Sequence, residues 1–314
     1  MPRSHLRSRR PAGAFLIPAA FTAVAVALAG CTTETRATAR PEPVPTAVRD
    51  AIDLRLPVTA YTPTADERLR SRQAVQRVLQ DCMKDFGLSF PSHDLRAPSG
   101  PVSATQMRYG VTSLAQAELT GYHFGAANPG WTATGPAPDP PDNTDPGYQL
   151  VLKGNGAPGT DGTPADHLGK PVPPGGCMGA MSRKLAAGAT FRGEAALVKQ
   201  ISAEGFDRSL KDRAVVAAFA KWSACMADRG HHYATPMDAL NDPAFAEAEP
   251  APNERETAKA DVACKAEHNV VGIWFAAEAT FQRARIAEHQ EELRTIRKQM
   301  DQQNSLAATV VATP

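Results

Sequence analysis

Four cysteines outside the N-terminal region are the most reactive side chains of the sequence: Cys82, Cys177, Cys225 and Cys264. Thiols either oxidise to disulfides or bind Zn²⁺ as thiolates. A zinc site is disfavoured because no C-x-x-C spacing occurs and because thiols oxidise outside the cytoplasm. The N-terminus, described below, indicates export. An even number of cysteines in an exported chain favours two disulfides, for which three pairings exist.

A repeated motif selects one of these pairings. Residues 82–90 and 225–233 share the pattern C-M-x-D-x-G-x-x-[FY], each time at the end of an amphipathic stretch. Each copy is followed by one further cysteine, in or before a second helical stretch. The simplest interpretation is one bridge per unit, Cys82–Cys177 and Cys225–Cys264. The second bridge would contribute roughly 3–4 kcal/mol on the chain-entropy model.

Three histidines could supply metal ligands if the second bridge brings them together. His231 and His232 follow the second motif, and His268 lies four residues after Cys264. Imidazole binds Zn²⁺ and Cu²⁺. We favour exposed polar residues at helix ends, where a protonated imidazole also suits the helix C-terminus. No metal and no other cofactor is therefore expected.

The common catalytic signatures are missing from the sequence. It has no G-x-S-x-G, no H-E-x-x-H and no P-loop, since Gly169-Lys170 is followed by Pro171. The acidic residues at 139–145 lack the spacing of an EF-hand and predict a solvated turn. Those at 247–256 surround two prolines and predict a loop and a helix start. No catalytic residue is therefore predicted.

Aromatic side chains fall into two groups. One group is expected to form the core of the C-terminal helices: Trp222, Tyr233, Trp274, Phe275 and Phe281. The other group lies in the irregular middle of the chain: Tyr109, Tyr122, Phe124, Trp131 and Tyr148. Aromatic residues exposed on loops can bind a glycan or a protein partner. The second group is therefore the predicted binding surface.

The N-terminus has the layout of a secretory signal. Residues 3–10 contain four arginines, and no acidic residue occurs before Glu34. An apolar, alanine-rich run at 14–29 follows, with the length of a signal-peptide core and too short for a comfortable membrane span. It ends in Leu28-Ala29-Gly30-Cys31, which resembles the lipobox of bacterial lipoproteins. The resemblance implies cleavage before Cys31 and acylation of its thiol.

Charge and hydropathy support the same location. The whole chain has a formal net charge of +1, and removing residues 1–30 takes away four arginines and no acid, which leaves −3. This balance excludes a nucleic-acid binder driven by bulk charge. No second apolar stretch is long enough to span a membrane. The lipid on Cys31 is therefore the expected anchor, on the outer face of the cytoplasmic membrane.

The elements that must position these residues are mainly helical. The chain contains 27 prolines and 23 glycines but few aromatics, which predicts helical parts joined by irregular segments. Apolar spacing predicts helices at 64–87, at 206–229 and at 253–299, the last bent at Gly272. Tyr148–Leu152 alternates weakly and predicts an isolated strand.

The predicted fold class is mainly α: two disulfide-stapled helical units with long Pro/Gly-rich irregular loops and little strand. A signal peptide (1–30) precedes Cys31 and a flexible tether (31–64). A first repeat unit (65–192), a helical second unit (193–300) and a disordered tail (301–314) follow.

The lipobox, the C-M-x-D-x-G repeat and Ala260–Cys264 together resemble a group of uncharacterised secreted lipoproteins of high-GC Gram-positive bacteria. The likeness covers most of residues 65–300 and implies location and architecture, but no activity. We expect a membrane-anchored protein that acts by binding, with a cell-wall glycan or an envelope protein as partner. The alternative is an extracytoplasmic enzyme that acts on cell-wall material.

Overall fold

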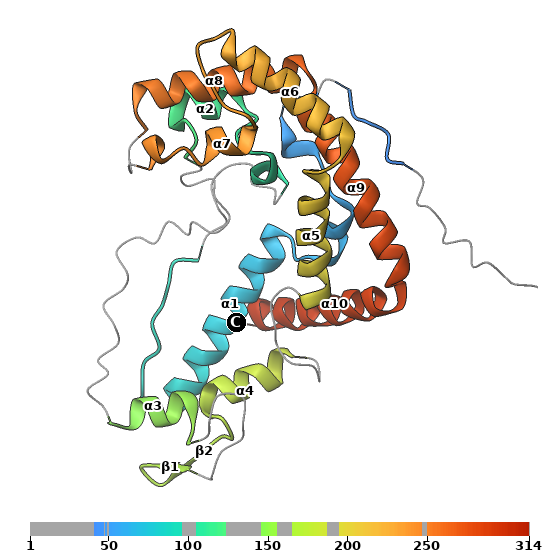
Figure 1. Ribbon diagram of the computed structural model, residues 1–314. Helices are drawn as coiled ribbons and strands as arrows, with labels where there is room; N and C mark the ends of the chain where they lie inside the picture. The colour runs from blue at the N-terminus through green and yellow to red at the C-terminus, as the bar shows by residue number, and fades with distance from the viewer. Residues whose placement is uncertain are drawn as a thin grey trace, which may run out of the picture. The chain divides into compact units, whose positions relative to one another are not determined.

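The computed structural model describes residues 41–46, 48, 50–95, 105–123, 146–155, 165–186, 195–246 and 250–313. This part of the chain is mainly helical, as predicted, with ten α-helices and one two-stranded antiparallel sheet (Figure 1). The elements are α1 (Ala65–Asp85), α2 (Leu114–Thr120), α3 (Pro146–Lys153), β1 (Ala165–His167), β2 (Lys170–Val172), α4 (Gly176–Leu185), α5 (Ala196–Ser209), α6 (Arg213–Ala227), α7 (Pro236–Leu240), α8 (Pro252–Glu267), α9 (Val270–Glu288) and α10 (Gln290–Ala312). Short 3-10 helices include η1 (Ala51–Asp53) and η2 (Pro57–Tyr61). None of the described helices is both long and apolar enough to cross a membrane.

Both copies of the repeated motif end a helix in the same way. After α1, Gly87 has a φ of +73°, and the amide of Leu88 donates to the carbonyl of Met83. After α6, Gly230 has a φ of +83°, and the next amide donates to the carbonyl of Met226. A left-handed residue after a helix is usually glycine because it has no Cβ to clash. The glycine of the motif therefore encodes a helix C-terminus.

The two disulfides follow the predicted pairing. Cys82–Cys177 joins α1 to α4 with a Cα–Cα distance of 5.7 Å, and Cys225–Cys264 joins α6 to α8 at 5.8 Å. Each bridge thus links the helix that carries a repeat motif to a second helix, which confirms the prediction of one bridge per unit.

Three clusters of buried apolar side chains form the interior of the described part. The first combines α6, α8 and α9 with residues 109–122, and includes the fully buried Trp222 and Trp274. The second combines α1, α3, α4 and α10, and the third joins η2 to α5 and α10. Of the aromatics predicted for the C-terminal core, Phe275 is also buried, whereas Tyr233 and Phe281 are half-buried.

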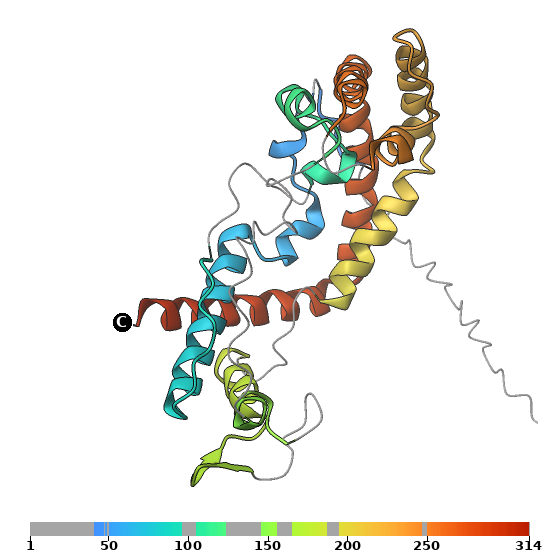
Figure 2. The ribbon, with the colours of Figure 1, turned by 90° about the vertical axis from the view of Figure 1, so that its left-hand side faces the viewer.

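The predicted disordered tail is wrong for residues 301–312. These residues belong to α10, and Ala307 and Val310 are buried in the second cluster against α1 and α4. Figure 2 shows α10 crossing α1. The C-terminal helix therefore packs with the first repeat unit, because its apolar stripe continues past Met300 and is matched by α1.

The last third of the chain has more breaks than predicted. The predicted helix at 206–229 is divided at Asp212. The carboxylate of Asp212 accepts hydrogen bonds from the amides of Ala214 and Val215 and so caps the N-terminus of α6. The predicted helix at 253–299 is divided into α8, α9 and α10. The break after α8 lies at Asn269, which has a φ of +47°. Asparagine tolerates this conformation better than most residues, so the predicted bend at Gly272 is wrong.

Two further local predictions are corrected. Tyr148–Leu152 is helical within α3 rather than an isolated strand, because Tyr148 and Val151 lie three residues apart and are both buried. The Gly/Pro-rich residues expected to be irregular include the hairpin of β1 and β2, in which His167 pairs with Lys170.

Most of the described residues of the predicted flexible tether pack on later elements, whereas its residues 31–40 lie outside the described part of the chain. Residues 41–46, 48 and 50–61, which we call the strap, run alongside α9 (Figures 1 and 2). Side chains of later residues bind the backbone of the strap. Three strap amides donate to them: Glu42 N to Thr280 Oγ1 at 2.9 Å, Ala51 N to Thr112 Oγ1 at 3.0 Å and Val58 N to Gln282 Oε1 at 3.1 Å. Two strap carbonyls accept from them: Pro45 O from Asn269 Nδ2 at 2.8 Å and Ala60 O from Arg297 Nη1 at 2.9 Å. Partners more than sixty residues away order a segment that has no apolar period of its own.

Gly272 lets the strap approach α9, and its replacement gives a test. A Cβ at this position would lie 2.4 Å from Pro45 O and 2.5 Å from Asn269 Oδ1. Gly272→Ala should therefore lower the free energy of unfolding by about 1–3 kcal/mol, as overpacking does. Helix propensity alone predicts the opposite sign, a gain of about 1 kcal/mol. Urea unfolding gives the sign, and hydrogen exchange at the amides of Ala51 and Val58 reports the strap.

Ala287→Val is the matched control, because Ala287 is an exposed residue of the same helix. It should change the free energy of unfolding by less than about 0.5 kcal/mol. A Gly272→Ala variant that is more stable than the wild type, with unchanged exchange at both amides, would contradict the packing of the strap on α9.

Candidate functional site

Of the five aromatic residues predicted to form a binding surface, the three that the structure describes are buried. Tyr109, Tyr122 and Tyr148 have exposed fractions of 0%, 5% and 4% and belong to the interior clusters. Phe124 and Trp131 lie outside the described residues. The prediction failed because it treated irregular segments as exposed. Their backbone is instead tied down by buried polar groups, so the aromatic rings turn inward.

One buried network surrounds Glu278 of α9. Its Oε1 accepts from Arg108 Nε at 2.5 Å and from Gln282 Nε2 at 2.9 Å, and its Oε2 accepts from Tyr109 Oη at 3.1 Å. Burial raises the pKa of Glu278, and the bonds from Arg108 and Tyr109 oppose that rise. The carboxylate has no exposed surface, so it fixes residues 108–109 to α9 and does not face a substrate.

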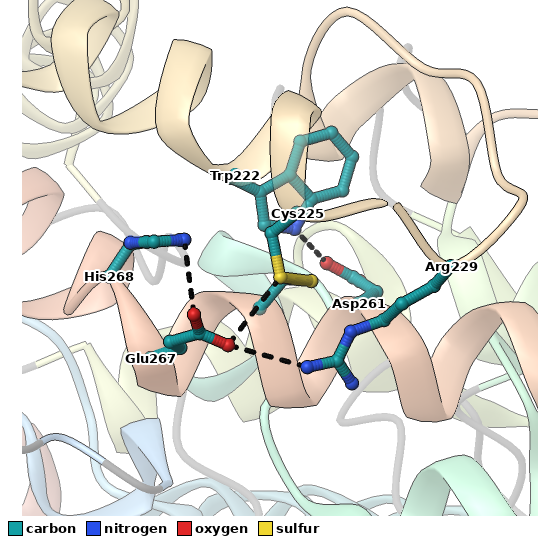
Figure 3. Close-up of a disulfide and its surroundings, with 7 residues drawn as sticks. Trp222, Cys225, Arg229, Asp261, Glu267 and His268 are labelled. Atoms are coloured by element: carbon teal, nitrogen blue, oxygen red, sulfur yellow. Dashed lines mark hydrogen bonds and ion pairs between the residues drawn. A yellow bond between two sulfur atoms is a disulfide. The ribbon is translucent and has the colours of Figure 1, made fainter. Parts of the chain in front are cut away.

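A second buried network surrounds Asp261 of α8. Trp222 Nε1 donates to Oδ1 at 2.9 Å (Figure 3). Lys265 Nζ donates to Oδ2 at 2.8 Å. The same ammonium group donates to Val111 O at 3.0 Å. The side chains of Asp261 and Lys265 are 0% and 2% exposed, and burial raises the pKa of the carboxyl. The buried Asp261–Lys265 pair therefore links α6, α8 and the loop before α2 in the protein interior.

A third buried carboxylate, Glu254, holds the end of α2. Its Oε1 accepts from Tyr122 N at 2.8 Å, and its Oε2 lies 3.4 Å from His123 Nε2. A Cβ on Gly121 would lie 2.4 Å from Oε1 of Glu254, so only glycine fits there. Together with the two networks above, this contact explains why residues 105–123 are ordered. No periodic pattern in the sequence predicts this contact, because the partners are separated by more than a hundred residues.

The surroundings of the second disulfide contain the one three-residue metal-type cluster among the described residues (Figure 3). Ligand atoms of Cys225, Glu267 and His268 lie within 4.8 Å of one another. The sulfur of Cys225 is already bonded in the disulfide, and Glu267 also pairs with Arg229 at 3.3 Å. Two remaining ligands on a half-exposed surface make a weak metal site.

The three histidines considered as ligands are not gathered into one cluster in the described part of the chain. His231 Nδ1 lies 3.2 Å from Thr257 Oγ1, and His268 lies beside Glu267. His232 is exposed. These positions agree with polar residues at helix ends, and the expectation of no bound metal stays a prediction.

An open groove beside α10 has a volume of about 580 Å³. It is lined by residues of α10 and by the last residue of η2: Tyr61, Arg294, Arg297, Lys298, Asp301, Gln302 and Ser305. Three of these side chains are cationic at neutral pH and one is anionic. The groove therefore presents an excess of positive charge together with neutral hydrogen-bonding groups.

Helical spacing and the strap explain why these residues meet. Arg294, Lys298 and Gln302 follow one another at intervals of four on α10, so they share a face. Arg297 Nη1 donates to Ala60 O at 2.9 Å, and its Nη2 lies 2.5 Å from Asp301 Oδ1. These bonds fix both Arg297 and the end of η2, which carries Tyr61.

This groove was not predicted from the sequence. The apolar residues of α10 at 293, 296 and 300 identify its packed side, but no pattern indicates that Tyr61 completes the opposite side. A cluster of three basic residues within 294–298 was the available signal. In comparisons with protein-family models, curated proteins and solved structures, none matched this chain.

Proposed function

We propose that the protein is an extracytoplasmic lipoprotein, anchored to the cytoplasmic membrane through Cys31, that acts by binding. The anchor rests on the basic start, the apolar run and the Leu28-Ala29-Gly30-Cys31 sequence. Cys31 itself lies outside the described residues. The observation that supports binding is the cationic groove beside α10, which is open to solvent and partly held in place by the strap.

Binding accounts for the groove better than catalysis does. The carboxylate that lines it, Asp301, is paired with Arg297 and so is poorly placed to transfer protons. The buried carboxylates Glu254, Asp261 and Glu278 are each bonded to neighbouring residues and are shielded from solvent. Cations in an open groove, one of them held in place, suit recognition of an anionic ligand without chemical change.

Replacing the lipidated cysteine tests the anchor. Cys31→Ser should remove the protein from the membrane fraction, or leave an uncleaved precursor, because one thiol carries the proposed attachment. Carbonate-washed membranes and culture medium are compared by immunoblot. Thr32→Ser, which changes the next residue and keeps the thiol, should remain in the membrane fraction. A cleaved Cys31→Ser protein that resists the carbonate wash would contradict the lipid anchor.

A sedimentation assay tests binding against catalysis. Full-length protein extracted in neutral detergent is incubated with purified cell-wall fragments, and pellet and supernatant are then separated. We expect the protein in the pellet, with no new reducing ends or free amino groups in the supernatant. Release of such groups in proportion to enzyme and time would contradict a protein that acts only by binding.

A further inference from the structure

We propose that the groove beside α10 binds the phosphodiester groups of an anionic polyol or sugar polymer. This inference rests on the proposed binding function and adds the chemical class of the ligand. It follows from the charge of the groove, from the fixed position of one cation, from the exchangeable contacts of the others and from the length of the lined surface.

The cations of the groove differ in how firmly they are held. Arg297 is bonded to Ala60 O and to Asp301, so its guanidinium group is held in place before a ligand arrives. Arg294 pairs with Glu291, but these side chains are 59% and 85% exposed. An exposed pair of this kind is worth at most about 1 kcal/mol and is readily exchanged for a phosphate.

Lys298 has neither a hydrogen bond nor an ion pair with any part of the chain that the structure describes. It lies four residues after Arg294 on the same face of α10. An ammonium group and a guanidinium group at this spacing can contact one phosphate, or two neighbouring phosphates. The two residues are therefore the main recognition groups of the proposal.

The shape of the site favours a narrow chain. Its lining on α10 extends from Arg294 to Ser305, which at 1.5 Å per residue is about 16 Å of helix. The cations occupy residues 294–298, about 6 Å of this helix, and Asp301 and the neutral residues follow them. Because the lining follows a single helix, we favour a linear polymer over the dispersed headgroups of a bilayer.

The neutral residues of the lining suit the rest of such a polymer. Tyr61 offers an aromatic face and a hydroxyl group, and Gln302 and Ser305 offer donors and acceptors for polyol or sugar hydroxyls. A ligand with phosphates spaced by hydroxylated units would use both kinds of group.

The test measures binding of synthetic poly(glycerol phosphate) to full-length protein in neutral detergent, by thermophoresis at low and moderate salt. The double variant Arg294→Gln/Lys298→Gln should bind at least tenfold more weakly and depend less on salt. The control Arg213→Gln/Lys221→Gln removes two exposed cations from α6 and should bind within twofold of the wild type. Circular dichroism checks that both variants are folded.

A second arm separates the two sources of phosphodiester. The cleaved Cys31→Ser protein, which lacks the lipid, is mixed with phosphatidylglycerol or phosphatidylcholine vesicles. Polymer binding that is lost in the groove variant supports the proposal. Binding to phosphatidylglycerol vesicles that depends on the groove, without binding to the polymer, overturns the proposal in favour of a membrane surface. Equal polymer binding by the groove variant and the control variant shows that the groove is not the binding site. Failure of polymer binding while cell-wall fragments still retain the protein rejects the ligand class and leaves the binding function intact.

Discussion

Asp261→Ala is expected to lower the free energy of unfolding by about 3–5 kcal/mol. The substitution leaves the ammonium group of Lys265 buried without its carboxylate, and removes the acceptor for Trp222 Nε1. Val111 O would be the remaining partner of Lys265 in this space. Urea unfolding followed by circular dichroism measures the change, and we also expect residues 109–123 to become sensitive to protease.

Two further variants make this prediction specific. Glu267→Ala changes an exposed carboxylate of the same helix and should cost less than about 0.5 kcal/mol. The double variant Asp261→Leu/Lys265→Met should be more stable than Asp261→Ala, because no charge is then left buried. If Asp261→Ala unfolds at the same urea concentration as the wild type, the buried pair does not exist as described.

Removal of the second disulfide is also expected to have a large effect. Cys225→Ala/Cys264→Ala should lower the free energy of unfolding by about 2–4 kcal/mol, because the open chain has more freedom when unfolded. Trp222 and Trp274 are fully buried in the cluster that this bridge closes. In a Trp131→Phe background, their emission should shift to longer wavelength at a lower urea concentration.

The first disulfide provides the control. Cys82→Ala/Cys177→Ala removes the bridge between α1 and α4, whose cluster contains no tryptophan among the described residues. It should also reduce stability, but the tryptophan emission of the folded protein should change less than in Cys225→Ala/Cys264→Ala. Peptide mapping without reduction should recover Cys82–Cys177 and Cys225–Cys264. A peptide that joins Cys82 to Cys225 would contradict the division into two bridged pairs of helices.

Local signals in the sequence were sufficient for the mainly helical class, for the helix α1, for two helix ends and for the bridges. The C-M-x-D-x-G repeat identified two helix ends, since glycine is the residue that accepts the left-handed conformation after a helix. The same repeat chose the disulfide pairing. Thr64 and Glu67, three residues apart, form a capping box at the start of α1. In each case the interacting residues lie close together in the sequence or carry a recognisable repeated pattern.

Contacts between distant residues could not be predicted in this way. The strap has no apolar period, and its order depends on side chains such as Thr280 and Gln282, which follow it by more than two hundred residues. Glu278 and Asp261 resemble ordinary helix surface residues in the sequence, because their buried partners Arg108 and Trp222 lie 170 and 39 residues away. The groove also depends on a contact between distant residues, because Tyr61 lies against α10 through the packing of the strap on α9.

The proposed lipid on Cys31 is the feature that would place the groove outside the cytoplasm. The direct measurement is the mass of the N-terminal peptide of protein extracted from membranes by detergent. We predict a peptide that begins at Cys31 and carries a diacylglycerol-type modification on its thiol. A peptide that begins at any other residue, or an unmodified Cys31 in the membrane-extracted protein, would contradict the account.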